Sequence, residues 1–422
     1  MAEIIVHRKI EEITPRRRIT IGVVLVIMAG LMTALFAVTA DPNAFTTFGL
    51  TPGGISRGVA PDLVLPTMEV IIALTALVGL AGIFQLARGF GRYTNLVLGV
   101  SFFFLIFALM IWTASGKSLN LAGLLKGSLL LSVPIALGAL SGVMSERSGV
   151  VNIAIEGMML MGAMTGALFG SITKNFWIGL LAALIAGLLM AAIHAVLSIK
   201  YKVDQIISGT VINIFGAGLS SFISSKFMQT YENLNNPPIF PRVPIPGLAD
   251  IPFLGPILFN NNIFVYVLFI LLIVMQIALF KTRWGLRLRS VGEHPKAADT
   301  LGINVIRTRY MAVLLSGVIA GFGGAYFTLG SIGRFEELMT AGKGFIGLAA
   351  MIFGNYSPVG TFGASMLFGF FENLGPSLSL LGSKIPNQFT SMLPYIATMV
   401  ILAGVVGRGQ VPAADGIPYE KE

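Results

Sequence analysis

Long apolar stretches, separated by short polar and basic segments, recur along almost the whole chain. A helix needs roughly 20 apolar residues to cross a bilayer, so each stretch predicts one transmembrane helix. The pattern predicts spans near residues 20–40, 67–87, 94–114, 120–142, 151–171, 176–199, 206–226, 262–281, 308–330, 341–356, 359–372 and 391–407. The pair at 341–372 is short and interrupted by Gly and Pro, which favours broken or re-entrant helices. We therefore expect an all-α polytopic membrane protein of about 10–12 transmembrane helices.

The composition supports this class. Only 11% of the 422 residues are charged and 55% are hydrophobic, whereas soluble domains carry about 25% charged residues. The 50 glycines are typical of helices that approach closely in lipid. With no cysteine and three histidines, a metal centre or another bound cofactor is not expected.

The basic residues indicate an orientation. If the N-terminus lies inside and every span crosses, most Lys and Arg residues fall on inside segments, as the positive-inside rule requires. Both termini are then expected to be cytoplasmic. The net charge of +9 reflects this topology and does not indicate a nucleic-acid partner.

Catalytic motifs do not emerge from the sequence. The segment ASGKS at residues 114–118 ends like a phosphate-binding loop, but Ile111 stands where that loop has its first Gly. No HExxH motif occurs. The chain is therefore not expected to be an enzyme, and a membrane hydrolase is the weakest alternative.

Two polar residues interrupt the apolar stretch SERSGVVNIAIEGMMLMGAM. Asn152 and Glu156 are four positions apart, so on a helix they would share one face. A charge at mid-membrane costs roughly 3 kcal/mol on insertion scales and usually lines a bundle interior or a water-filled path. We therefore predict that both residues line a substrate pathway. The alternative is that Glu156 is neutral or paired and only locks helices together.

The stretch at residues 344–375, GFIGLAAMIFGNYSPVGTFGASMLFGFFENLG, contains Asn355 and Pro358 between two apolar halves. Discontinuous helices often line substrate sites in transporters, so these two residues are further pathway candidates. Tight packing of small residues is the alternative. The GxxxG pairs at 138–142 and 317–321 predict packing contacts between helices.

The segment at 281–310 is the longest predicted inside connection and carries seven basic residues. Within HPKAADTLGI, Pro295 is a helix start, residues 297–301 favour a helix and Gly302 is a natural stop. This order predicts a short amphipathic helix that docks a soluble partner. The alternative is a basic loop that contacts anionic lipid.

Three blocks, in this order, carry a resemblance to a known family: GALSGVMSERSGVVNIAIEGMMLMGAM, VGEHPKAADTLGI and GFIGLAAMIFGNYSPVG with LFGFFE. They resemble permease subunits of bacterial ABC importers in the ribose and branched-chain amino acid permease class, in particular the branch that serves nucleosides and simple sugars. The resemblance covers roughly residues 126–407. It implies an ABC importer permease core at 119–407 with a cytoplasmic coupling loop at 281–310. Residues 1–118 would then be a leader with about three extra transmembrane helices, and 408–422 a cytoplasmic tail.

The resemblance also implies a role and partners. The chain would form the translocation path in the bacterial cytoplasmic membrane, while ATP is bound and hydrolysed by separate ABC ATP-binding subunits. A second homologous permease subunit and an extracytoplasmic substrate-binding protein or lipoprotein would complete the importer. The residues implied in ATPase coupling are Glu293, Pro295, Lys296, Ala297, Ala298 and Gly302. The family motif E-A-A-x-x-x-G has Glu where this chain has Lys296.

Two other functions remain open. An ion-coupled secondary transporter would act alone, with Glu156 as its coupling site. An ABC permease of the same architecture could carry branched-chain amino acids or autoinducer-type sugars. A zwitterionic amino acid needs fixed partners or helix N-termini for both of its charges, and the sequence shows no clear pair.

Overall fold

The computed structural model describes residues 15–421 apart from 55, 57, 383–391 and 393–410. Within these residues, nine helices are long and apolar enough to cross a membrane. They span Pro15–Ala37, Thr67–Ala87, Gly91–Thr113, Leu121–Glu146, Ile155–Thr173, Phe176–Lys200, Gln205–Met228, Ile263–Lys281 and Val305–Ile332. Each coincides with one of the first nine predicted spans to within about one helical turn, so those predictions are confirmed.

The last three predicted spans differ from this pattern. The span at 341–356 contains α13, Lys343–Phe353, whose 11 residues are too short to cross a bilayer. The span at 359–372 lies inside α14, Pro358–Leu380, which carries Pro376 in its interior. The span at 391–407 lies outside the described residues, apart from position 392. The interrupted pair thus forms a short helix followed by a longer one.

The chain divides into two compact units, residues 1–124 with 374–407 and residues 125–373 with 408–422. In the first unit, three long helices contact one another: α1 (Pro15–Met32, continued by η1, Thr33–Ala37), α2 (Thr67–Ala87) and α3 (Thr94–Thr113, preceded by η2, Gly91–Tyr93). Only 28% of the apolar window of Thr67–Ala87 is buried inside the protein. The rest of its surface is available to lipid.

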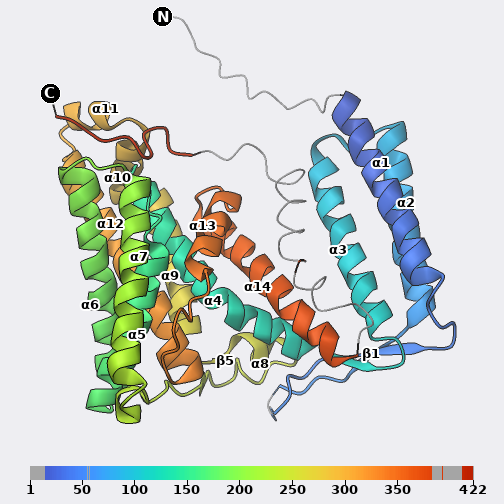
Figure 1. The fold of residues 1–422 in the computed structure, drawn as a ribbon. Helices are drawn as coiled ribbons and strands as arrows, with labels where there is room; N and C mark the ends of the chain where they lie inside the picture. The colour runs from blue at the N-terminus through green and yellow to red at the C-terminus, as the bar shows by residue number, and fades with distance from the viewer. Residues whose placement is uncertain (1–14, 55, 57, 383–391, 393–410, 422) are drawn as a thin grey trace, which may run out of the picture. The chain divides into compact units, whose positions relative to one another are not determined.

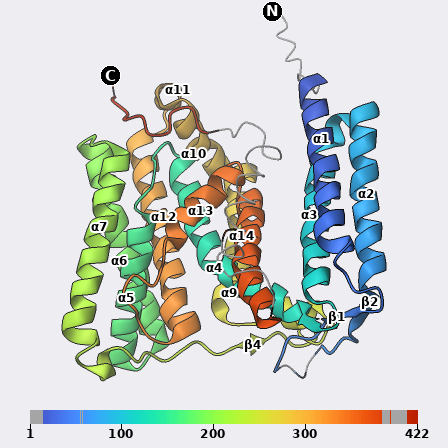
Figure 2. The same cartoon turned by 45° about the vertical axis from the view of Figure 1, so that its right-hand side comes forward.

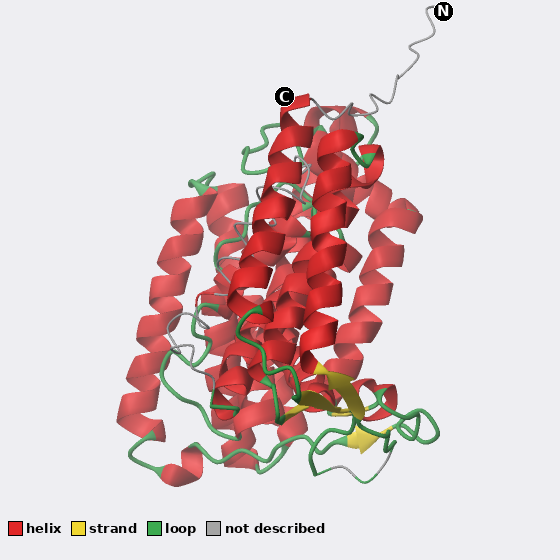
Figure 3. Ribbon diagram, turned by 90° about the vertical axis from the view of Figure 1, so that its right-hand side faces the viewer, coloured by secondary structure: helices red, strands yellow, loops and turns green. Residues whose placement is uncertain are grey.

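Short strands accompany the helices of the first unit, and the sequence pattern did not predict them. β1 (Phe45–Gly49) pairs antiparallel with β2 (Leu63–Pro66) and parallel with β3 (Ser118–Asn120). Figure 3 shows how short these strands are beside the helices. The fold class is still helical, because the strands only connect the helix ends.

The second unit is a helical bundle. Its long helices are α4 (Leu121–Glu146, with its first four residues in the first unit), α5 (Ile155–Thr173), α6 (Phe176–Ala195), α7 (Gln205–Ile223), α9 (Ile263–Lys281), α12 (Val305–Ala325) and α14, whose residues from Leu374 onward belong to the first unit. Three of them continue as π-helical turns, η3 (Val196–Lys200), η4 (Ser224–Met228) and η6 (Tyr326–Ile332). The apolar window of α4 is 83% buried and that of α9 only 28%. Thus α4 lies in the core, whereas α9 packs against the core with one side and has exposed apolar residues, such as Ile270 and Ile273, on the other.

Small residues set the distances between α5, α6 and α12. A Cβ atom built on Gly187 of α6 would lie 2.8 Å from Cα of Gly321 on α12, and one on Gly162 of α5 would lie 2.7 Å from the Gly321 carbonyl oxygen. These backbones touch, which only glycine permits. The predicted packing role of the GxxxG pair at 317–321 is confirmed.

Apart from α13, the short elements of the second unit lie at its two ends (Figures 1 and 2). α10 (Arg283–Glu293) and α11 (Pro295–Thr300) lie at one end, beside residues 411–421. At the other end are α8 (Leu254–Leu258), η5 (Glu232–Leu234) and the strand pair β4 (Val243–Pro244) and β5 (Asn260–Asn261).

Candidate functional site

The carboxyl group of Glu156 lies at the start of α13. Its Oε1 accepts hydrogen bonds from the Thr340 hydroxyl at 2.6 Å and from the Gly342 amide at 2.8 Å, and its Oε2 accepts one from the Gly344 amide at 2.6 Å. The first amides of a helix lack intrahelical acceptors and carry partial positive charge, so a carboxylate there is stabilising. Glu156 thus joins the first turn of α5 to a short helix almost two hundred residues further along the chain.

Asn152 does not share a helix face with Glu156, so that expectation was wrong. Helix α5 begins at Ile155, and Asn152 lies in the turn that precedes it. Its Oδ1 accepts from the Ala154 amide at 3.1 Å, and its Nδ2 donates to the Ser316 hydroxyl of α12 at 2.8 Å. The side chain is fully buried, where it fixes the turn against α12.

Asn355 and Pro358 lie at a third place. Arg147 donates from Nε to the Tyr356 carbonyl at 2.8 Å and from Nη2 to the Asn355 carbonyl at 3.2 Å. Burial lowers the pKa of the Arg147 guanidinium, and the nearby Glu293 carboxylate opposes this effect. Pro358 is the first residue of α14. The structure therefore does not bring the four pathway candidates to one site, and their role in a pathway stays a prediction.

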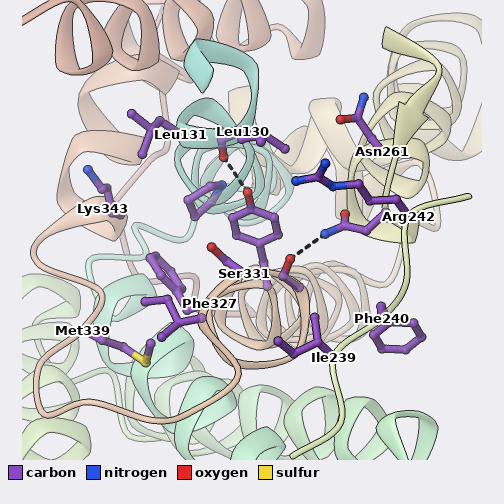
Figure 4. A pocket seen from close by; sticks show the side chains of 15 residues that line it. Leu130, Leu131, Ile239, Phe240, Arg242, Asn261, Phe327, Ser331, Met339 and Lys343 are labelled. Atoms are coloured by element: carbon purple, nitrogen blue, oxygen red, sulfur yellow. Dashed lines mark hydrogen bonds between the residues drawn. The ribbon is translucent and has the colours of Figure 1, made fainter. Parts of the chain in front are cut away.

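A cavity of about 420 Å³ opens in the second unit, near the end that carries β4 and β5 (Figure 4). It is lined by residues of α4, of the segment before α9, of η6 and of the turn that leads into α13. Its lining residues are Leu130, Leu131, Pro134, Ile239, Phe240, Arg242, Asn261, Asn262, Tyr326, Phe327, Gly330, Ser331, Ile332, Met339 and Lys343. A cavity of this size, with apolar walls and a few polar groups, is typical of a small-molecule site.

The polar groups of the cavity are mostly amides and hydroxyls. Nδ2 of Asn262 donates to the Gly330 carbonyl at 2.6 Å, while Oδ1 of the same side chain is buried and has no hydrogen-bond partner in the described structure. The residue is 7% exposed, so this oxygen needs a donor that the protein itself does not provide. The Tyr326 hydroxyl is occupied, because it donates to the Leu130 carbonyl at 2.9 Å.

Two cations lie on opposite sides of the cavity, Lys343 and Arg242 (Figure 4). Lys343 forms an ion pair with Glu372 of α14, which balances its charge. Arg242 is exposed. Apart from these two cations, the lining side chains are aliphatic, aromatic, amide or hydroxyl groups.

The sequence analysis did not find this cavity. A usable signal was present in the three consecutive asparagines 260–262, which directly precede the apolar span at 262–281. Their amides could not be assigned a partner, because α4 and η6 approach them only in the folded bundle.

The predicted short helix in the 281–310 segment is present. α11 begins with Pro295 at its first position, the His294 ring accepts a hydrogen bond from the Ala297 amide at 3.2 Å, and Gly302 follows the helix at φ +79°. Ala298 is buried, whereas Lys296 and Ala297 are exposed. The segment also contains a helix that was not predicted, α10, which holds Glu293 at its last residue.

These features define a class: a multi-pass membrane protein with a cavity of small-molecule size at one end of its second unit and two short helices, α10 and α11, at the other. The chain belongs to the family described as branched-chain amino acid transport system / permease component, whose pattern matches residues 124–403. The resemblance noted in the sequence is thereby confirmed. Permease components of this kind bind no cofactor and are not enzymes, because ATP is bound and hydrolysed by the ATPase subunits of the ABC transporter.

Three relatives show how far the similarity extends. The chain is 43% identical to the guanosine ABC transporter permease protein NupQ of Bacillus subtilis, covering 70% of this chain and 95% of the relative. It is 40% identical to the nucleoside ABC transporter permease protein NupC of Lactococcus lactis, covering 69% and 95%. It is 32% identical to the putative glucose ABC transporter permease protein TsgC13 of Haloferax volcanii, covering 71% and 98%. No solved structure matches the chain.

Proposed function

We propose that this chain is the translocation subunit of an ATP-driven importer of nucleosides. The observation that carries the proposal is the 43% identity to a guanosine permease over nearly all of that protein's length, together with the 40% identity to a nucleoside permease. The relative named for glucose is less similar, at 32%. Nucleosides are therefore favoured over simple sugars.

The cavity chemistry supports a nucleoside. A nucleobase offers a flat face for stacking on a ring such as that of Phe327, and it offers N–H groups as donors. Oδ1 of Asn262, a residue of the cavity wall, has no donor among the described residues and would accept from such a group if the side chain turned toward the cavity. An uncharged nucleoside also requires no further ion pair beside Lys343 and Glu372.

Coupling is assigned to the opposite end of the second unit. α11 would insert into the ATP-binding subunit with Pro295, Lys296, Ala297 and Ala298, and Gly302 would end the helix. Glu293, the last residue of α10, would position the start of α11. Lys296 replaces the acidic residue of the family motif, so its contact on the ATPase would be acidic or a helix C-terminus.

We also propose the orientation and the assembly. The basic α10–α11 end would be cytoplasmic, in agreement with the positive-inside rule, and so would both termini. The cavity would then open toward an extracytoplasmic binding protein that delivers the nucleoside. A second homologous permease subunit would pair with this chain. The candidates Asn152, Glu156, Asn355 and Pro358 would act on the pathway indirectly, by fixing the helices that surround it.

The ion-coupled alternative is less consistent with the geometry of Glu156. Three donors already occupy its carboxyl oxygens, whereas a coupling carboxylate has to exchange its proton or ion during transport. The site therefore favours a structural lock. The alternative still has a direct test, because it predicts uptake that depends on an ion gradient.

Uptake of radiolabelled guanosine by cells that lack the chain, with and without its reintroduction, tests the proposal. We expect uptake only with the chain present, competition by unlabelled nucleosides, and no competition by leucine or ribose. Competition by leucine alone would indicate that the chain carries amino acids instead of nucleosides. Replacing Asn262 with Ala should raise the guanosine concentration for half-maximal uptake about tenfold, since a lost hydrogen bond to a buried group is worth about 1–3 kcal/mol. An unchanged concentration would show that this cavity is not the substrate site.

A further inference from the structure

The C-terminal segment 411–421 is docked onto α10 (Figure 1). The Ala414 amide donates to the Gly292 carbonyl at 2.8 Å, and the Ala413 amide donates to Oε2 of Glu293 at 3.2 Å. Ala414 is only 6% exposed. The segment is therefore part of the folded unit at the point where α10 meets α11.

A buried cation depends on this segment. Arg309 of α12 is 2% exposed and donates from Nη1 to the Ile417 carbonyl at 2.9 Å. A buried guanidinium without a counter-charge is strongly destabilising. Asp415 lies close enough to interact electrostatically with this guanidinium and hydrogen-bonds the carboxyl group of Glu146 at the end of α4, so the segment contacts both α12 and α4. Burial raises the pKa of Asp415 to about 7, against the lowering effects of Glu146 and Arg309.

The end of the segment reaches α11. Tyr419 packs against the small apolar cluster of Val291, Ala298 and Val305. Lys421 lies 3.7 Å from Asp299 of α11, and Glu420 forms an ion pair with Lys202 before α7. Residues 411–421 thus join α11 to four other parts of the bundle: α10, α12, the end of α4 and the segment before α7.

The outer surface of this arrangement is open. A cavity of about 560 Å³ is bounded by residues 293–296 on one side and by 414 with 417–421 on the other. Two large apolar side chains project from the same end of the unit, with Ile417 54% exposed and Leu301, next to α11, 81% exposed. Both signs of charge surround them, since Lys296, Glu420 and Lys421 are exposed.

We propose that residues 411–421 form one continuous docking surface with α11 for the ATP-binding subunit, and that they hold α11 on the bundle so that its movement reaches α4 and α12. The inference rests on the proposed function, which assigns α11 to that subunit. The occupant is a soluble protein and not an anionic membrane surface, because mixed charges around apolar side chains are typical of a protein interface.

Single cysteines test the contact, because the chain contains none of its own. Ile417→Cys and Val243→Cys give thiols at positions of matched exposure, 54% and 53%, at opposite ends of the unit. After labelling of the purified complex with a benzophenone maleimide and irradiation, we expect a cross-link to the ATP-binding subunit from position 417 and none from 243. A cross-link from Leu301→Cys but not from Ile417→Cys would overturn the inference.

A second measurement uses charge instead of a thiol. Ile417→Glu should lower the amount of ATP-binding subunit that co-purifies with the chain about tenfold, while Val243→Glu should leave it unchanged and both variants should elute as monodisperse protein. Co-purification at the wild-type level with Ile417→Glu would contradict the docking role. If the wild-type chain itself retained no ATP-binding subunit, the proposed function would be contradicted, independently of the role of residues 411–421.

Discussion

Replacing Glu156 with Gln separates a structural lock from a transport site. Gln can keep its carbonyl oxygen near the Thr340 hydroxyl and the Gly342 amide, but its NH₂ group then faces the Gly344 amide, which loses its acceptor. A hydrogen bond to a charged group is worth about 1.5–3 kcal/mol, and the lost charge at the start of α13 adds about 0.3–1 kcal/mol. The free energy of unfolding should therefore fall by about 3 kcal/mol. Replacement with Ala removes all three contacts and should cost about 5 kcal/mol.

Equilibrium unfolding of the purified chain in mixed micelles of SDS and a mild detergent measures these values. Glu69 offers a matched control, since it is an exposed acidic residue in the first turn of α2, and Glu69→Gln should change the free energy by less than about 0.5 kcal/mol. Unchanged stability of Glu156→Gln, combined with loss of uptake, would refute the lock. Glu156 would then be the coupling group of a transporter.

Three further predictions follow from particular contacts. Gly302→Val should uncouple ATP hydrolysis from uptake, because a β-branched residue at φ +79° costs about 1–2 kcal/mol. Gly302→Asn should retain coupling. Normal uptake by the Val variant would show that α11 has no role in coupling. Gly321→Val should prevent folding, because even its Cβ atom would clash with the backbone carbonyl oxygen of Ala183 on α6. Gly218→Val, with nothing within 4 Å, should still yield monodisperse protein. Equal yields of the two variants in gel filtration would contradict the packing. The raised pKa of Asp415, about 7 against 3.8, means that the docked tail holds a proton that the released tail loses, so docking should weaken as pH rises from about 4 to about 7. Protection of the tail from carboxypeptidase should follow this course, and Asp415→Asn should abolish it; a pH-independent wild type would contradict the assignment. The other titratable groups in the electrostatic environment of Asp415 are Glu146, Arg309, Tyr356 and Tyr419.

The sequence predicted the spans well because burial in lipid imposes length and hydropathy on each helix separately. It also predicted α11, since Pro295 and Gly302 act on their own neighbours. These are local constraints, so the pattern of residues along the chain contains them.

The contacts of the polar residues could not be predicted in the same way. Nothing near Glu156 in the sequence points to Thr340 or Gly344, and the tail at 411–421 becomes part of the α10–α11 end only when Arg309 and Gly292 are in place. Asn152 was assigned to a helix because the apolar stretch around it is continuous, whereas the turn at 151–154 ends that continuity in three dimensions. In each of these three examples, the structure depends on contacts with residues that lie far away in the sequence.

ATP-dependent uptake into proteoliposomes tests the central claim most directly. The chain, copurified with its partner subunits and reconstituted with the binding protein outside, should accumulate radiolabelled guanosine only when ATP is enclosed, and a non-hydrolysable ATP analogue should abolish the accumulation. Uptake by the chain alone, driven by an ion gradient without ATP, would contradict the account.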